Sequence, residues 1–496
     1  MAGRLVVLAF SEASPVLIDS FCAAGKMPVL TALRERGLVG RTRYAAPYLL
    51  TPQMWATVLT GRNAGSHGVF DYRQRSADGR FRELCGADIQ GPTLIDAFDD
   101  AGLSAGFVNL PMTSPPRPTR GFILAGQDAP GAHPSIAQPP QLYHQLVARF
   151  GRYRHKDIFP GYEGKAAYAR TIPREVDRQA EVLSWIAASR EWDFLALYTS
   201  GTAFAQHYFW SDMQTPDAPF RSVVEETYRA SDRLIGRIAE QLHADDRLFV
   251  ISECGAGPIR SGVRLNSWLE HEGFLTRSRG GASASARVLH FLRKTAPRVL
   301  PKRAFHLVNR PRWKAAVQSG IEGDGVDWAR TRAFHRGKGE GNVYLRLRKG
   351  EPGYEETRDG IAARLQGLRD PSTGVPAVRA VHRREDLYSG PFVEEAPDLI
   401  VEWDDFAYMP CEGLDVSPAI FGQRIREYMT WPTSGSHRRE GFLLASGGVL
   451  RSGELGAPMD LVDLAPTWLD MLGVGAPRGM EGVSRALQLE CRNLNA

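Results

Sequence analysis

The stretch from Leu50 to Gly61 constrains the fold of this chain more than any other. It reads Leu-Thr-Pro-Gln-Met-Trp-Ala-Thr-Val-Leu-Thr-Gly, follows an extended lead-in from Arg43, and predicts a turn into a helix at Thr51-Pro52. Proline suits the first helical position, because the N–H that it lacks would have no partner there. We therefore expect Thr51 at the N-cap, with its hydroxyl over the positive end of the helix dipole. Such a hydroxyl can simply cap the helix, or it can act as a nucleophile or help to bind an anion.

Length and cysteine usage limit the class of protein. The 496 residues allow about one to three domains with a large buried core. The apolar run at the N-terminus is too short to span a membrane and lacks a small-residue cleavage site, so it predicts a first strand rather than a signal peptide. The five cysteines are scattered and form no CxxC pair, which disfavours a disulfide framework and favours a cytoplasmic location. They are Cys22, Cys85, Cys254, Cys411 and Cys491.

Positive charge is concentrated in one segment. Residues from Arg277 to Lys314 include eleven Lys or Arg and no Asp or Glu, although the whole chain carries a net charge of only +5. Together with its prolines, this composition predicts an inserted basic cap over residues 270–325. The segment could be a solvated face, draw in a small or carrier-bound anionic substrate, or make peripheral contact with an acidic surface. It has no Rossmann, zinc-finger or RNA-binding signature, so nucleic acid is disfavoured as a partner.

Short apolar runs alternate with helical patterns along the chain and predict an α/β fold. Predicted strands cover residues 5–10, 105–110, 121–126, 194–198, 248–252 and 396–401, and predicted helices begin near Val16 and cover 176–190 and 460–473. In a parallel sheet, functional residues gather at the carboxyl ends of the strands. Polar residues stand at those ends in this sequence: Ser11-Glu12, the loop from Ser200 to His207, and Glu253-Cys254.

These motifs, taken in order, resemble a known family. Thr51-Pro52 with Thr60-Gly61, Asn63, Gly65 and His67-Gly68 resembles the nucleophile segment of the alkaline phosphatase superfamily. The closest branch is that of the type I phosphodiesterases/nucleotide pyrophosphatases. The resemblance continues through Gln206-His207, Ser252-Glu253-Cys254-Gly255, Leu265-Asn266-Ser267-Trp268 and Gly435-Ser436-His437-Arg438. It implies a mostly parallel central sheet flanked by helices on both faces, with core segments 1–269 and 326–496 around the cap.

The resemblance also implies a two-metal site, which this sequence alters. In the family, three Asp, three His and a nucleophilic Thr hold two divalent cations. The matching residues here are Ser11, Thr51, Glu253 and Cys254 for one cation, and Ala203, His207 and His437 for the other. Four of the six Asp/His ligands are replaced, so we expect no ordinary two-metal centre. Either no metal or one zinc-like ion on some of Glu253, Cys254, His207 and His437 is expected instead. Glu12 could replace the missing acid beside Ser11, but neighbours on an extended segment point in opposite directions.

Three functions are compatible with this altered site. The first is a hydrolase or transferase for a phospho- or sulfo-ester, with Thr51 as nucleophile and reduced metal use. The second is a metal-independent enzyme that uses Cys254, His437 and Thr51 for acyl transfer or acid–base chemistry. The third is a pseudoenzyme that binds a ligand or a partner. In any of these, His335, Arg336 and Lys338 could contact substrate, or they could form a plain surface loop.

Overall fold

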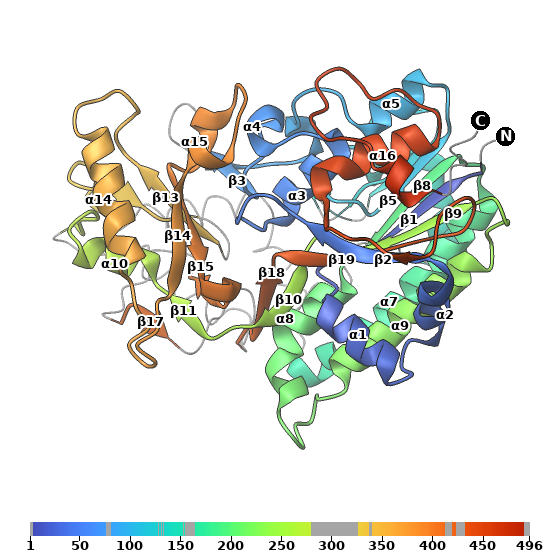
Figure 1. The fold of residues 1–496 in the computed structure, drawn as a ribbon, viewed down its shortest axis with the longest axis horizontal. Helices are drawn as coiled ribbons and strands as arrows, with labels where there is room; N and C mark the ends of the chain where they lie inside the picture. Colours follow the sequence, from blue (N-terminus) through green and yellow to red (C-terminus); the bar gives the residue numbers. More distant parts are fainter. Residues whose placement is uncertain are drawn as a thin grey trace.

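The computed structural model describes residues 3–75, 81–126, 128–129, 131, 133–151, 153, 164–278, 326–336, 340–411, 419–422 and 432–490. The chain forms a large α/β part and a smaller second lobe (Figure 1). Both termini lie on the large part, at the end away from the second lobe. Most of the predicted basic cap, including residues 279–325, falls outside the described residues, so the predicted domain bounds stay a prediction. The two flanks of that segment do meet, because Arg277 and Val326 form an antiparallel β-bridge.

The large part is built on one ten-stranded, mostly parallel sheet. In order across the sheet, the strands are β20 (Gly453–Glu454), β2 (Leu38–Arg43), β19 (Glu440–Ser446), β9 (Arg247–Ile251), β1 (Leu5–Phe10), β8 (Phe194–Thr199), β5 (Ala105–Val108), β6 (Phe122–Leu124) and β7 (Ala137–Gln138), with β21 (Met459–Asp460) also paired to β2. The pairs from β9 through β6 are parallel, while β19 and β7 run antiparallel to their neighbours. The predicted fold class is confirmed.

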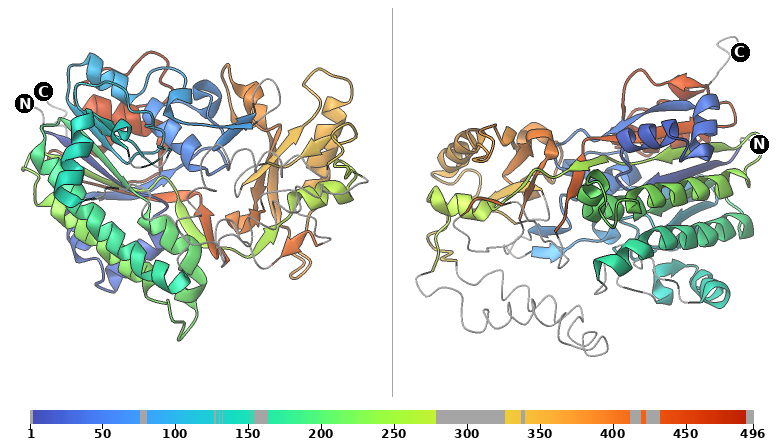
Figure 2. Two further views of the ribbon diagram at one scale, coloured as in Figure 1. Left: turned by 180° about the vertical axis from the view of Figure 1, so that it is seen from behind. Right: turned by 90° about the horizontal axis from the view of Figure 1, so that it is seen from below.

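Side chains of β1 alternate between two hydrophobic cores, as a period of two requires. Leu5, Val7 and Ala9 pack into one core, whereas Val6, Leu8 and Phe10 pack into the other. The sheet is therefore covered by helices on both faces (Figure 2). The first face carries α3 (Thr51–Thr60), α5 (Leu94–Asp100) and α16 (Leu464–Met471). The second carries α1 (Pro15–Ala23), α2 (Pro28–Arg36), α6 (Pro140–Phe150), α7 (Lys165–Ser189), α8 (Gly201–Gln214) and α9 (Val223–Ala239).

The second lobe has a hydrophobic core of its own, formed by residues between Val263 and Phe421. A four-stranded sheet in the order β12 (Ala333–Phe334), β13 (Gly341–Leu345), β15 (Leu399–Trp403) and β14 (Val378–Arg383) packs with α10 (Leu265–His271) and α14 (Tyr354–Gln366). A second small sheet holds β16 (Tyr408–Pro410), β11 (Ser261–Val263) and β17 (Phe421–Gly422). The strand predicted at residues 396–401 thus exists as β15, but it belongs to this lobe.

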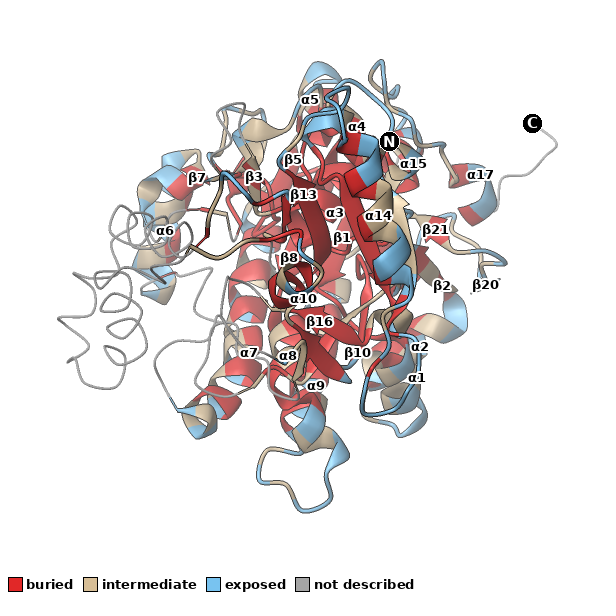
Figure 3. Cartoon of the chain, turned by 90° about the vertical axis from the view of Figure 1, so that its left-hand side faces the viewer, coloured by how far each residue is buried: buried red, intermediate tan, exposed pale blue. Residues whose placement is uncertain are grey.

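A two-stranded ribbon lies between the large part and the second lobe (Figure 1). Its strands, β10 (Gly255–Pro258) and β18 (Gly435–Arg438), are antiparallel, and Ala256 stands opposite His437. In the view along the long axis, most buried residues lie in the middle of the molecule, and most exposed residues lie on the outer helices and loops (Figure 3). The remaining named elements are α4 (Ala64–His67), β3 (Arg73–Arg75), β4 (Phe81–Glu83), α15 (Arg384–Leu387), α17 (Ala486–Leu489) and five 3₁₀ turns, at Gly86–Asp88, Pro134–Ile136, Val393–Glu395, Asp404–Phe406 and Leu461–Asp463.

Two local predictions need correction. The segment predicted as a loop from Ser200 to His207 is helical from Gly201 onward, because it forms the first half of α8. Thr51 occupies the first position of α3 and Pro52 the second, so Leu50 rather than Thr51 is the N-cap residue. The shift is one residue, within the usual uncertainty of helix ends.

Among the described residues, no single helix has the length and apolar character needed to cross a membrane. One pair, α1 and α2, meets the length and composition criteria jointly, with a bend of 100° between its helices.

Candidate metal centre and nucleophile segment

Glu12 is the residue around which the candidate site is arranged. It follows the last residues of β1 in a turn, and its φ of 56° places it in the left-handed region, which non-glycine residues seldom adopt. This turn directs the carboxylate away from the strand, and the side chain is almost fully buried. The backbone is held in place by Gln206, whose Nε2 donates to the Glu12 carbonyl oxygen at 2.9 Å. The expectation based on extended neighbours therefore does not apply at Glu12.

His207 presents one ring nitrogen to Glu12. It lies on α8, and its Nε2 is 3.2 Å from Oε1 and 3.1 Å from Oε2 of that carboxylate. Its other nitrogen, Nδ1, is 2.8 Å from the carbonyl oxygen of Gly435. A carbonyl oxygen only accepts hydrogen bonds, so Nδ1 carries a proton. In the neutral imidazole, the lone pair must then be on Nε2, which faces Glu12.

His437 is held in the same way from the opposite side. It lies on β18, its Nε2 is 3.1 Å from Oε1 of Glu12, and its Nδ1 is 2.8 Å from Oε1 of Glu340. The two imidazole rings are nearly perpendicular, with centroids 5.5 Å apart. Glu340, which directly precedes β13 of the second lobe, is buried. Both histidines thus direct Nε2 to one point and use Nδ1 for an outer hydrogen bond.

The charges of this group depend on each other. Burial opposes ionisation of Glu12, but His207 and His437 outweigh burial and hold the pKa of Glu12 far below its usual range. Burial likewise opposes protonation of His437, but the carboxylates of Glu12 and Glu340 raise its pKa well above the ordinary value. Without a metal, the group is therefore a buried ion pair, in which a proton on His437 Nε2 occupies the place that a cation would take.

Glu12, His207 and His437 form a suitable set of ligands for a divalent metal. Their donor atoms all lie within 4.8 Å of one another. For zinc bound tetrahedrally at about 2.0–2.1 Å from each ligand, neighbouring donors are roughly 3.3–3.4 Å apart. The observed N–O separations of 3.1–3.2 Å are close to that value. Two histidines and one glutamate also match the ligands of open catalytic zinc sites. In the described part of the chain, this is the only such group of three or more residues.

The residues matched to the other family cation have different surroundings. Ser11 Oγ donates to Glu253 Oε1 at 2.9 Å, and both side chains are buried. Burial, with a contribution from the charge of Glu12, raises the pKa of Glu253 to about 7. Cys254 is completely buried, and burial raises the pKa of its thiol well above the ordinary value. A protonated thiol is a poor nucleophile, and complete burial favours a packing role for Cys254.

Thr51 is linked to this second set of residues only indirectly, through the aromatic side chains of Trp55 and Tyr198. It is buried at the start of α3, one helical turn before Trp55 and on the same helix face. The Trp55 ring contacts that of Tyr198 edge-to-face, with centroids 5.2 Å apart. Tyr198 in turn hydrogen-bonds Ser11 and lies within electrostatic range of Glu253.

The remaining predicted site residues supply no ligand to the candidate metal centre or lie outside the described residues. Ala203 is buried on α8, one turn before His207, and supplies no ligand. His335 is buried, and its Nδ1 donates to the Asn342 carbonyl at 2.7 Å, so it holds a loop together. Arg336 stacks on the ring of Phe81 at 4.4 Å. Lys338 lies outside the described residues.

The candidate site includes two residues that the predicted site lacks. The sequence indicates Glu12 only as a possible replacement for the missing acid beside Ser11, and its left-handed backbone has no clear signal in the sequence. Glu340 lies two residues after Lys338, in the segment that the sequence left open as either a substrate-contacting loop or a plain surface loop. The residue type of Glu340 is the sequence signal for a role in the site, because a buried carboxylate needs a hydrogen-bond or charge partner.

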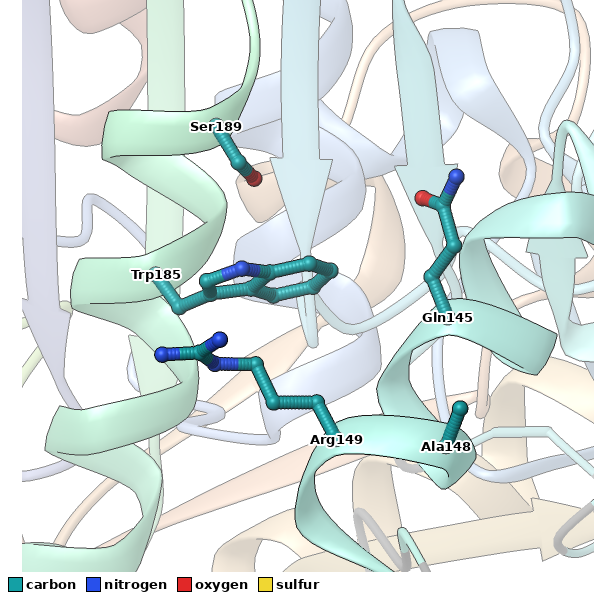
Figure 4. A pocket seen from close by; sticks show the side chains of 5 residues that line it. All are labelled: Gln145, Ala148, Arg149, Trp185 and Ser189. Atoms are coloured by element: carbon teal, nitrogen blue, oxygen red, sulfur yellow. The ribbon is translucent and has the colours of Figure 1, made fainter.

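A separate groove lies on the helical layer and uses none of these residues. It is formed between α6 and α7 by Gln145, Ala148, Arg149, Trp185 and Ser189 (Figure 4). The Arg149 guanidinium lies 5.9 Å from the centroid of the Trp185 ring.

Comparisons with known proteins agree with this architecture. Residues 5–413 match the sequence model of the type I phosphodiesterase/nucleotide pyrophosphatase family. Murine ectonucleotide pyrophosphatase/phosphodiesterase 5, solved with AMP, aligns with a TM-score of 0.51 and 12% identity over 96% of both chains. Phosphonoacetate hydrolase from Sinorhizobium meliloti 1021, solved with phosphonoformate, aligns with a TM-score of 0.56 and 16% identity over 95% of this chain and 96% of that one. A comparison with curated protein sequences finds no match. The family match, together with this fold, shows that the chain belongs to the type I phosphodiesterase/nucleotide pyrophosphatase family of the alkaline phosphatase superfamily.

Proposed function

We propose that this protein is a hydrolase or transferase for an anionic phospho- or sulfo-ester that works with one divalent metal in place of two. The single observation that carries the proposal is the convergence of Glu12, His207 and His437. Both histidines use Nδ1 for an outer hydrogen bond and direct Nε2 toward Glu12, which supplies the negative charge. When bound, a zinc-like ion would polarise the ester and offset its negative charge.

Thr51 is the proposed nucleophile. Its hydroxyl is at the first turn of α3, where backbone N–H groups and the helix dipole favour an oxyanion or a bound phosphoryl oxygen. Its proton needs an acceptor, and Glu253 is the candidate base, because a carboxyl group with a pKa of about 7 can take up a proton near neutral pH. Ser11 would then orient that carboxyl group through the 2.9 Å hydrogen bond.

The absence of the family's second acid at Ala203 supports a single cation. Two dications bring four positive charges, and the family offsets them with three aspartates. Here, Glu12 and Glu253 are the available carboxylates, and Glu253 loses part of its charge through burial. Cys254 would add negative charge only by losing a proton, which burial of its thiol opposes. The same burial of Cys254 weighs against a metal-independent enzyme that uses this thiol.

Turnover of model substrates by Thr51→Ala tests this function. The purified chain is assayed with bis-p-nitrophenyl phosphate, p-nitrophenyl phosphate, p-nitrophenyl sulfate and phosphonoacetate, after zinc or manganese loading. We expect turnover of at least one ester by the wild-type protein, and a loss of about a thousandfold or more in Thr51→Ala. Thr57→Ala, at a buried threonine six residues later in α3, is the matched control. Full activity of Thr51→Ala would rule out Thr51 as the nucleophile, and wild-type activity that survives chelation would rule out the metal.

A further inference from the structure

Glu340 carries a further inference, because it joins the second lobe to the candidate metal centre. Its carboxylate accepts from His437 Nδ1 at 2.8 Å, on the side of the ring opposite Nε2. An ion bound at Nε2 lies beyond the ring from Glu340, so Glu340 cannot bind the same ion. A carboxylate on the second nitrogen of a metal-binding histidine fixes the ring's tautomer and orientation and makes Nε2 more basic.

The position of Glu340 is fixed by its own loop. Two residues later, Asn342 is completely buried, and its Nδ2 donates to the Tyr48 hydroxyl at 2.6 Å and to Asp71 Oδ2 at 3.2 Å. The Tyr48 hydroxyl donates in turn to Asp71 Oδ2 at 2.7 Å. Asn342 therefore anchors the start of β13 on the segment that leads into Thr51.

The other side of the loop is anchored as well. Asn266 Nδ2 donates to the His335 carbonyl at 2.9 Å, and the His335 N–H donates to Asn266 Oδ1 at 2.7 Å. The His335 ring then holds the Asn342 carbonyl. These contacts explain the burial of His335 without assigning it a role in substrate binding.

We propose that Glu340 is a positioning residue of the metal centre, and that Asn342 fixes Glu340 relative to the segment carrying Thr51. The second lobe thereby sets the orientation of His437 and its spacing from the nucleophile. The inference rests on the proposed metal centre and adds to it a residue outside the family's ligand positions. Because Glu340 acts through His437, its loss should affect the binding of the metal before it affects the chemistry.

Zinc affinity of Glu340→Gln tests this inference. The dissociation constant for Zn²⁺ is measured by competition with a chromophoric chelator, using the full chain. We expect Glu340→Gln to bind zinc about 10- to 100-fold more weakly than the wild-type protein, as for other outer-shell carboxylates. Glu402→Gln is the matched control, because Glu402 makes the same kind of contact in the same lobe, 2.8 Å from His382 Nε2. Zinc affinity of Glu402→Gln should equal that of the wild-type protein.

A spectroscopic readout separates positioning from stability. In the Co²⁺-loaded protein, the visible absorption reports the ligand geometry, and we expect it to shift in Glu340→Gln and not in Glu402→Gln. If Glu340→Gln does not fold, Glu340→Asp keeps the charge but withdraws it by one methylene, and it should weaken zinc binding at least about threefold. Zinc affinity within twofold of wild type in a folded Glu340 variant would overturn the inference alone. A wild-type protein that binds no zinc would overturn the proposed metal centre as well.

Discussion

Replacing Glu12 by Gln should remove most of the zinc affinity of this protein. The substitution keeps the size of the side chain and its burial, and the amide can still accept a hydrogen bond. It removes the carboxylate that lies within 3.2 Å of Nε2 of both His207 and His437. Of the three grouped ligands, the imidazoles of His207 and His437 then remain, and neither carries a negative charge that would offset the charge of the cation.

The size of the loss follows from the number of ligands. Structural zinc sites with four ligands bind with roughly 10–16 kcal/mol at neutral pH, or about 3 kcal/mol for each ligand. Since about 1.4 kcal/mol corresponds to a factor of ten, the loss of one ligand should weaken binding roughly 100-fold. The figure is a lower bound for Glu12, because it is the ligand that carries the charge.

Isothermal titration and chelator competition with Zn²⁺ measure this effect directly. Glu253→Gln is the control, because Glu253 is an equally buried carboxylate next to Ser11 but is not one of the three grouped ligands. We expect Glu253→Gln to keep zinc affinity within about threefold, since Glu253 hydrogen-bonds Ser11 and is neither one of the grouped ligands nor the acceptor of a ligand's Nδ1. Equal losses in the two variants would refute the assignment of Glu12, and so would an unchanged affinity in Glu12→Gln.

Three further predictions concern the ligand positions and the stability of the fold. Adding Ala203→Asp to Glu12→Ala should restore zinc affinity by about tenfold, because positions 203 and 207 share one face of α8; an affinity no better than that of Glu12→Ala would contradict this. Burial lowers the pKa of His67 to about 3, so the unfolded chain binds a proton below pH 6.5 that the folded chain does not, and stability should fall by about 1.4 kcal/mol per pH unit between pH 6.5 and 3. Urea midpoints at pH 7 and pH 5 should show this contribution in the wild-type protein and lack it in His67→Gln. Trp468→Ala should lower the free energy of unfolding by about 3–5 kcal/mol, since the ring is buried against Phe194; a change below about 1 kcal/mol by urea denaturation would disagree.

The sequence predicted the central sheet well because buried parallel strands have a strong local signal. The run from Leu5 to Phe10 is β1 residue for residue, and the run predicted at 194–198 is β8 with one more residue. Successive side chains in such a run point to opposite faces of the sheet, which accounts for the two hydrophobic cores on either side of it. The second lobe was less predictable, because its short strands pair across long stretches of chain and no single run identifies the partner. The family match confirms the family and the fold, whereas the roles of the site residues stay predictions.

The candidate site was less predictable because it depends on backbone conformation. The sequence placed Ser11 and Glu12 on an extended segment, where one of the two must point away. In the structure, the chain turns at Glu12 with a positive φ, and the longer side chain reaches His207 and His437. Glu340 reaches His437 through a contact across 97 residues of sequence, which no local pattern reveals.

The metal content of the purified protein tests the central claim most directly. The full chain is loaded with zinc, desalted and analysed by inductively coupled plasma mass spectrometry, alongside Glu12→Gln. We predict about one zinc per wild-type chain and a large loss in the variant. Two metals per chain would mean that Glu253 and Cys254 also bind a cation, and would contradict a single-metal centre. No metal in the wild-type protein would mean that Glu12 and His437 serve as a buried ion pair, and would contradict the proposed metal chemistry altogether.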